Sequence, residues 1–219
     1  NQCLNANNFD FINTSKMAWG GLTSYWELGD GTKVNATNAM HAYTSIGTYV
    51  VLLQETSIND CKDTIRKTIE VYPMPKTGFM IDDSLQCLTG NTFKFTNTST
   101  ISSGSLSYKW YFGDGNTSIL KNPQHSYTNF GTYNVKLVSL SASGCSDSIT
   151  QVLVVYPMPQ VKPIVNLNNA CINGQNFQFT DSSAIAYGNL SRIWKFGDST
   201  LTSLKNPNKT FSYAKPYLV

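Results

Sequence analysis

Five cysteines, two histidines and several aspartates beside glycines are the residues of this chain whose types could do chemistry. Thiolates and imidazoles can act as nucleophile and base, and four of them at suitable spacing can hold zinc. The cysteines lie far apart without a Cys-x-x-Cys pair, and the sequence has no nucleophile elbow, no His-x-x-x-His pair and no phosphate loop. These patterns predict a protein that is not an enzyme and that holds no zinc.

The same residues recur at a fixed step of 84 residues. His41 and His125 occupy one repeat position, each two residues before a tyrosine, and Lys209 takes that position in the third copy. A catalytic group is not expected to recur as a scaffold position, so we interpret both histidines as packing residues. The step is kept by three tryptophans and three cysteines, namely Trp26, Trp110, Trp194, Cys3, Cys87 and Cys171.

Each of these tryptophans begins a motif that predicts a strand ending in a tight turn. In the middle copy, Trp110-Tyr111-Phe112 precedes Gly113-Asp114-Gly115, and alternation sends Trp110 and Phe112 to one face of the strand. Glycine accepts a positive φ at the turn, and the aspartate can accept hydrogen bonds from backbone N–H groups. The residues that we expect to be structural for this reason are Trp26, Asp30, Gly31, Trp110, Asp114, Gly115, Trp194 and Asp198.

The complete middle copy predicts an all-β sandwich. Short apolar-polar alternations are separated by turn signals, and no stretch with a 3.6-residue period competes with them. The predicted strands are 77–81, 92–98, 105–112, 125–127, 132–139 and 148–155.

Three motifs of the middle copy together resemble the PKD domain, an immunoglobulin-like module named after polycystic kidney disease proteins. They are Trp-x-Phe-Gly-Asp-Gly at 110–115, Asn-Pro-Gln-His-Ser-Tyr at 122–127 and Gly-Thr-Tyr-Asn-Val at 131–135. The resemblance implies tandem immunoglobulin-like PKD β-sandwiches. With the repeat step, it predicts domains at 1–73, 76–157 and 160–219.

The first and last of these units are expected to be incomplete. By the repeat register the first copy lacks the segment that matches 77–81, and the third lacks its last strand. We favour trimming from a longer protein over completion of the sandwich by strands of a neighbour. The Pro-Met-Pro junctions at 73–75 and 157–159 predict short stiff spacers, and therefore an elongated rod.

Two cysteine pairs have the same separation and predict one disulfide within each full domain, Cys3 with Cys61 and Cys87 with Cys145. We expect each bond to tie the entry of the second strand to the last hairpin, at one pole of the sandwich. Such a bond stabilises a domain by about 4 kcal/mol in the chain-entropy model. Cys171 is left without a partner in the sequence. Disulfides at equivalent positions indicate an extracellular or cell-surface location.

A calcium site is a weak alternative. Asp82 and Asp83 follow the first strand of the middle copy, and some PKD-like modules of secreted proteases hold calcium at such places. Calcium needs six to eight oxygen ligands, and the third copy has Asn166-Leu167 where the middle copy has the two acids. We therefore expect solvated loop acids and no cofactor.

Three further residues are candidates for contacts outside the fold. Trp19 lies beside two glycines in a connecting loop, where an exposed indole could stack on a sugar, although we favour a lid on the core. Thr64 and Ser148 lie in Asp-Thr-Ile and Asp-Ser-Ile, which resemble an O-glycosylation signal of bacteria in the Bacteroides lineage. A strand that begins with Ser or Thr is the simpler interpretation.

Composition excludes several partners. A formal charge of +3 with 13% charged residues gives no basic cluster for nucleic acid, and no apolar run is long enough for a membrane span.

The resemblance extends to the Cys-containing PKD repeats of giant surface proteins in gliding bacteria with type IX secretion. It implies non-catalytic stalk or adhesion repeats of a bacterial surface protein that contact neighbouring PKD repeats, surface glycans or other surface proteins. The alternatives are an accessory binding module of a secreted polysaccharide- or protein-degrading enzyme, and a filament subunit that exchanges strands.

Overall fold

The computed structural model describes residues 1–166, 176–213 and 216–219, and these ranges contain strands and turns but no helix. The chain is all-β, as predicted. Its contacts divide it into two compact units, one of residues 1–82, 93–125 and 134–152, and one of residues 83–92, 126–133 and 153–219. This division does not follow the 84-residue step, so the boundaries at 1–73, 76–157 and 160–219 stay a prediction.

The first repeat has a five-stranded sheet in the order β1-β7-β6-β3-β4 and a two-stranded sheet of β2 and β5. Its core includes Trp26, Leu28 and Val51, which are buried together. The bounds are β1 Gln2–Cys3, β2 Phe9–Phe11, β3 Leu22–Glu27, β4 Lys33–Val34, β5 Ala39–His41, β6 Gly47–Ser57 and β7 Lys62–Tyr72.

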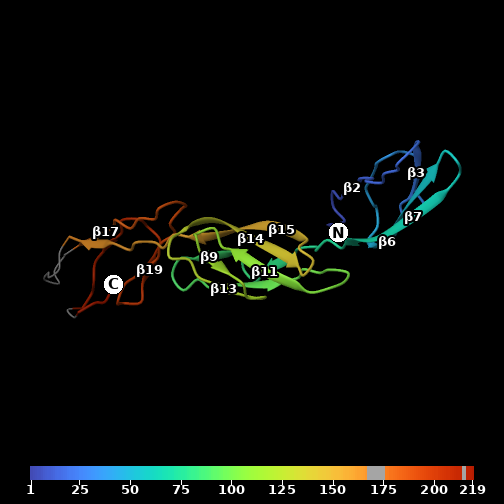
Figure 1. Ribbon diagram of the computed structural model, residues 1–219. Coiled ribbons are helices and arrows are strands. Elements are labelled where there is room, and N and C mark those ends of the chain that lie inside the picture. Colours follow the sequence, from blue (N-terminus) through green and yellow to red (C-terminus); the bar gives the residue numbers. More distant parts are fainter. Residues whose placement is uncertain (167–175, 214–215) are drawn as a thin grey trace. The chain divides into compact units, whose positions relative to one another are not determined.

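The second repeat has the same topology with a complete second sheet. Strands β12-β11-β14-β15-β9 form the five-stranded sheet, and β13-β10-β8 form the three-stranded one (Figure 1). The bounds are β8 Phe79–Ile81, β9 Leu85–Cys87, β10 Phe93–Asn97, β11 Leu106–Tyr111, β12 Thr117–Ser118, β13 Gln124–His125, β14 Gly131–Ser141 and β15 Ser146–Tyr156.

The strands described in the third repeat have the lengths of their equivalents in the second, except β18, which has two residues where β11 has six. Strands β16-β17-β20 form one sheet, and β18 pairs with β19. The bounds are β16 Pro163–Val165, β17 Phe177–Asp181, β18 Trp194–Lys195, β19 Leu201–Thr202 and β20 Asn208–Lys209.

Alternation places the apolar side chains as expected in the strands that carry most of the core. In β14, Val135 and Leu137 are buried, whereas Asn134 and Lys136 are exposed. In β15, Leu153 and Val155 are buried in the same way, because side chains two residues apart share one face of a strand. The two strands form a long hairpin that turns at Ala142–Cys145.

One short strand joins each five-stranded sheet in parallel. β1 pairs with the end of β7, with Cys3 opposite Tyr72, and β9 pairs with the end of β15, with Cys87 opposite Tyr156. These strands have only two or three residues, so they show no alternation that a sequence pattern could reveal. Their register decides where the two cysteines lie.

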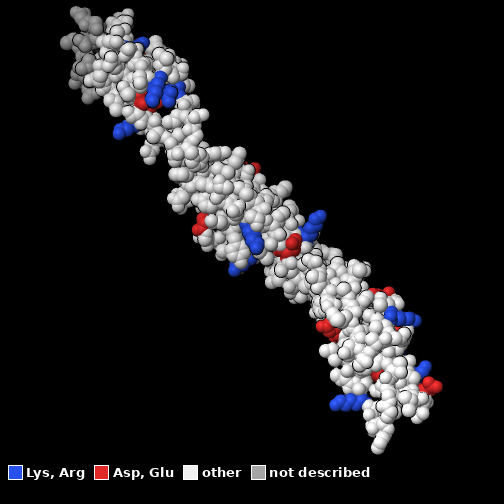
Figure 2. Space-filling model, turned by 90° about the horizontal axis from the view of Figure 1, so that it is seen from above, with Lys and Arg blue, Asp and Glu red and all other residues white. Residues whose placement is uncertain are grey.

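Charged side chains are few and scattered. On the face shown in Figure 2, basic and acidic groups of the described residues gather in no patch of one sign. In the part of the chain that the structure describes, no helix has the length and apolarity needed to span a bilayer.

Candidate functional site

The motif that begins at Trp26, Trp110 and Trp194 and ends in a tight turn, here called the Trp turn, recurs in all three repeats. Trp110 is fully buried, and its Nε1 donates to the carbonyl oxygen of Leu120 at 2.9 Å. Trp26 and Trp194 make the same bond to Ala36 and Leu204 at 3.1 and 3.0 Å. The indole thus joins its strand to the segment after the turn, because a buried N–H requires an acceptor.

The two glycines of this turn have different roles. An added Cβ at Gly113 would lie 2.9 Å from the carbonyl oxygen of Asn134, so this position has no room for a side chain. Gly115 has open space around it but a φ of 93°, a left-handed conformation that favours glycine. At the equivalent of Gly115 the third repeat has Ser199, which keeps a φ of 72°.

The turn aspartate bonds to the turn backbone with one carboxylate oxygen and to a histidine with the other. Asp114 Oδ1 accepts from the backbone N–H of Asn116 at 3.0 Å, and Oδ2 lies 2.7 Å from His125 Nε2. Burial raises the pKa of Asp114, but hydrogen bonds from His125 and Asn116 outweigh it and lower the pKa below its usual range. In the first repeat, His41 Nε2 likewise lies 2.7 Å from Asp30 Oδ2.

Lys209 replaces the histidine in the third repeat and keeps the contact to the turn aspartate. Its Nζ lies 2.6 Å from Asp198 Oδ2, and this hydrogen bond, with those from Thr200, lowers the pKa of Asp198 to about 2. An ammonium and an imidazole can both donate to a turn carboxylate, so this position keeps one contact in all three repeats. This agrees with a structural role, and the interpretation of the histidines as packing residues stays a prediction.

Asn91 is a buried asparagine whose role the sequence patterns did not predict. Asn91 Nδ2 donates to the carbonyl oxygens of Leu88 and Tyr127, and its Oδ1 accepts from the backbone N–H of Tyr127. Asn7 makes the same bonds to Leu4 and Tyr43 in the first repeat. The signal was the 84-residue step itself, because each asparagine follows its cysteine by four residues.

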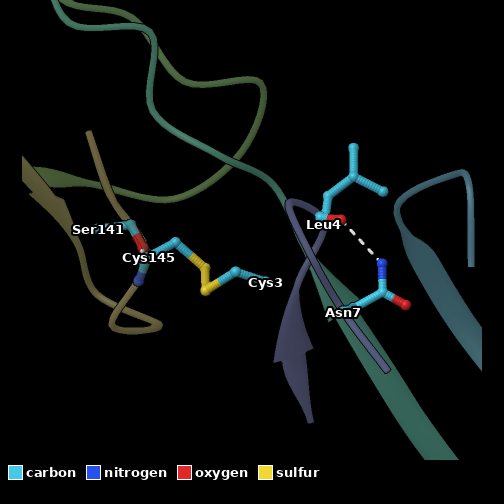
Figure 3. Close-up of a disulfide and its surroundings, with 5 residues drawn as sticks. All are labelled: Cys3, Leu4, Asn7, Ser141 and Cys145. Atoms are coloured by element: carbon cyan, nitrogen blue, oxygen red, sulfur yellow. Dashed lines mark hydrogen bonds between the residues drawn. A yellow bond between two sulfur atoms is a disulfide. The ribbon is translucent and has the colours of Figure 1, made fainter. Parts of the chain in front are cut away.

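The structure has a different disulfide from the two predicted. Cys3 is bonded to Cys145 of the second repeat, with Cα atoms 5.6 Å apart (Figure 3). Cys61 and Cys87 are free and exposed, so the bonds Cys3–Cys61 and Cys87–Cys145 are wrong. Cys171 lies outside the described residues.

Strand register explains why the predicted bonds cannot form. Cys3 lies opposite Tyr72 at the end of β7, whereas Cys61 lies just before its start at Lys62. Ten residues of strand separate these points by about 33 Å. A disulfide allows at most about 7 Å between Cα atoms. The same argument applies to Cys87, which lies opposite Tyr156 at the end of β15, and Cys145, which lies just before the start of β15 at Ser146.

The calcium candidates are engaged with the backbone. Asp82 Oδ1 accepts from the N–H of Lys94 at 3.0 Å, and Asp83 Oδ1 accepts from the N–H of Leu85 at 3.0 Å. Within the described ranges, no three His, Cys, Asp or Glu side chains gather as metal ligands. Calcium binding at Asp82 and Asp83 is untested by these contacts.

The candidates for outside contacts lie on the surface. Trp19 is 86% exposed, so its interpretation as a lid on the core is wrong. Thr64 and Ser148 are exposed on β7 and β15, and Asp147 accepts a hydrogen bond from the N–H of Thr77. Glycosylation at these hydroxyls stays a prediction.

The arrangement as a whole fixes turns and junctions. Among the described residues, every histidine is paired with a turn aspartate, and the recurring indoles close the turns. The chemistry that the geometry shows is disulfide formation between two repeats.

Comparison with known proteins agrees with this architecture. The family described as the PKD domain matches residues 4–72 and 75–156. Among solved structures, the PKD1 domain of Vibrio anguillarum Epp is 30% identical, covering 37% of this chain and 93% of that chain, with a TM-score of 0.34. The PKD1 domain of the Vibrio cholerae metalloprotease PrtV is 31% identical, covering 39% of this chain and 98% of that chain, with a TM-score of 0.31.

Proposed function

Because this chain belongs to the PKD domain family, we propose that its repeats are non-catalytic spacers of a secreted or surface-anchored bacterial protein. They hold an adhesive region away from the cell and carry tension. The observation behind this proposal is the Cys3–Cys145 bond, which joins one repeat to the next instead of closing a loop within one repeat. A covalent bond between modules limits their separation under load.

The location follows from the same bond. Disulfides persist in oxidising compartments and are rare in the cytosol. We therefore place the protein outside the cytoplasm, on the bacterial surface or secreted from it. Gliding motility and type IX secretion belong to this proposal only through the resemblance of the Cys-containing repeats.

A glycan-binding role is the second candidate. Trp19 supports it, because a side chain that is 86% exposed can stack on a sugar ring. An accessory module of a secreted enzyme would use such a residue to bind its substrate. A role as a strand-exchanging filament subunit has no comparable observation in its favour.

Binding and deletion experiments separate these roles. We expect the 219-residue chain to bind no polysaccharide on a glycan array beyond the level of Trp19→Ser, a variant that copies Ser103 of the second repeat. In the parent protein, we expect in-frame deletion of residues 76–159, one full repeat, to leave secretion unchanged and to weaken cell adhesion. Glycan binding that Trp19→Ser abolishes would support the accessory module and contradict the spacer.

A further inference from the structure

One end of the second repeat contacts the first repeat. We call this end the hairpin pole, which in the second repeat consists of Ala142–Cys145 and the neighbouring loop 101–105. Cys145 is 1% exposed and bonded to Cys3 (Figure 3). Nearby, Ser103 lines a cleft with Ile46, Val71 and other residues of the first repeat. In this pole Cys145 is buried beside the preceding repeat and Ile101 is half-buried, whereas 102–105 and 142–144 are exposed.

The third repeat uses the same positions toward the second. Tyr187 stands at the position of Ser103, and its ring packs edge-on against Phe130 with centroids 5.8 Å apart. Its hydroxyl donates to the carbonyl oxygen of Val155 at 3.2 Å. Phe130 and Val155 are the equivalents of Ile46 and Val71. Two successive junctions are therefore built from equivalent residues.

On the first repeat, the hairpin pole is exposed, and Met17, the equivalent of Ile101, is 44% exposed. Trp19, at the position of Ser103 and Tyr187, is 86% exposed, and Ile58 at the tip of the β6–β7 hairpin is 73% exposed. The loop and the tip are adjacent, because a Cβ at Gly20 would lie 3.4 Å from Ile58 Cδ1. Cys61, the equivalent of the buried Cys145, has a free and exposed thiol. The two poles therefore differ at the cysteine, which is buried and disulfide-bonded in the second repeat but exposed and free in the first.

We propose that the hairpin pole of the first repeat, formed by Met17, Trp19, Ile58 and Cys61, binds the end of another PKD repeat that carries a cysteine at the position of Cys3. A disulfide then forms between that cysteine and Cys61. Cys87 is the Cys3 equivalent of the second repeat and bonds in the same way to the hairpin cysteine of a following repeat. The bonds form a series in which each repeat is joined to the next.

The reaction balances with an oxidised disulfide as the electron acceptor. Each of the two cysteines loses one proton and one electron when the S–S bond forms. In the test below, glutathione disulfide accepts both electrons and both protons and gives two glutathione thiols. In an oxidising compartment, an oxidised dithiol–disulfide oxidoreductase accepts them.

The partner must come from another repeat for a geometric reason. Cys61 and Cys3 of the same repeat lie at opposite ends of β7, about 33 Å apart. Trp19 in this pole is the equivalent of Tyr187, which packs on Phe130 of the second repeat. We therefore expect Trp19 to pack on the equivalent residue of the partner repeat. An exposed apolar cluster of this kind marks an interaction surface.

A lengthened chain tests this proposal. A second copy of residues 1–84 is placed before Asn1, with Lys62→Arg in the added copy so that the two Cys61 peptides differ in mass. The protein is oxidised with glutathione disulfide, alkylated and digested without reduction. We expect a bond between Cys3 of the added copy and Cys61 of the original, while Cys3 of the original stays bonded to Cys145.

The retained Cys3–Cys145 bond reports that the original chain is folded. A Cys3–Cys61 bond within one copy, or alkylation of the original Cys61, would overturn the proposal. So would an adduct of Cys61 with glutathione alone.

The apolar part of the surface has its own test. In the lengthened chain, Ile58→Asp in the original copy is expected to slow formation of the new bond by about tenfold, a loss typical of a buried interface residue. Met40→Asp is the matched control, because Met40 is also exposed but lies on β5. Equal rates for the two variants would show that Ile58 and its neighbours do not dock the added repeat.

Discussion

His125 Nε2 lies 2.7 Å from Asp114 Oδ2, and the imidazole ring stacks on Phe112 with centroids 4.1 Å apart. The ring thereby connects the Trp turn to β13, which follows it in the chain. Lys209 makes the equivalent contact with Asp198, so a hydrogen bond to the turn carboxylate is kept where the imidazole ring is not. This contact fixes the turn in every repeat.

The lowered pKa of Asp114 predicts a loss of stability in acid. A carboxyl whose folded pKa is below its unfolded value of about 3.9 stabilises the fold above that value, and the contribution is lost as pH falls through the folded pKa. We expect Asp114→Asn to lower the free energy of unfolding by about 1–2 kcal/mol at pH 6 and to have a smaller effect at pH 3. Urea denaturation at both pH values measures this, and an equal loss at both would contradict it.

Ser199 predicts a weak turn in the third repeat. Its φ of 72° is strained for a side chain, so Ser199→Gly should stabilise the turn by about 1 kcal/mol. The readout is hydrogen exchange of the Phe196 amide, which donates to Thr200 across this turn and should exchange about fivefold more slowly. Gly115→Ser is the matched reverse change and should accelerate exchange at Phe112 by a similar factor. Unchanged exchange in both variants would exclude strain at this position.

Asn91 should be the most sensitive polar residue of the second repeat. Asn91→Ala leaves the buried N–H and carbonyl groups of Tyr127 without their partner and is expected to cost about 2–4 kcal/mol. Asn91→Asp should cost more, because a carboxylate oxygen would face the carbonyls of Leu88 and Tyr127. Chemical denaturation checks both values. A loss below that of Asn116→Ala, a change at an exposed turn residue, would contradict this account.

The sequence predicted the strands and turns better than the bonds between repeats. Alternation in 132–139 located β14, and the Gly-Asp motif located the turn, because both signals are local. Ile149, in the predicted strand 148–155, is nevertheless 36% exposed. Asn91 escaped notice because an asparagine in a loop resembles an ordinary turn residue.

The cysteine pairing could not be obtained from spacing. Equal separations within repeats are equally compatible with bonds from each repeat to the next, because all cysteines follow one step of 84 residues. Only the parallel register of β1 and β7, which places Cys3 beside Tyr72, decides between them. The exposure of Trp19 was ambiguous for a related reason, since its neighbours in sequence do not show which other segments pack near it.

Single-molecule stretching of the 219-residue chain from its two ends tests most directly whether tension passes from repeat to repeat through Cys3–Cys145. With the bond intact, the residues between these cysteines cannot extend, and reduction should release roughly 500 Å of additional chain. Cys3→Ser alone should give the same full release without reductant. If Cys3→Ser released only the segment up to Cys61 and reduction then released more, the bonds would lie within repeats and the account would be wrong.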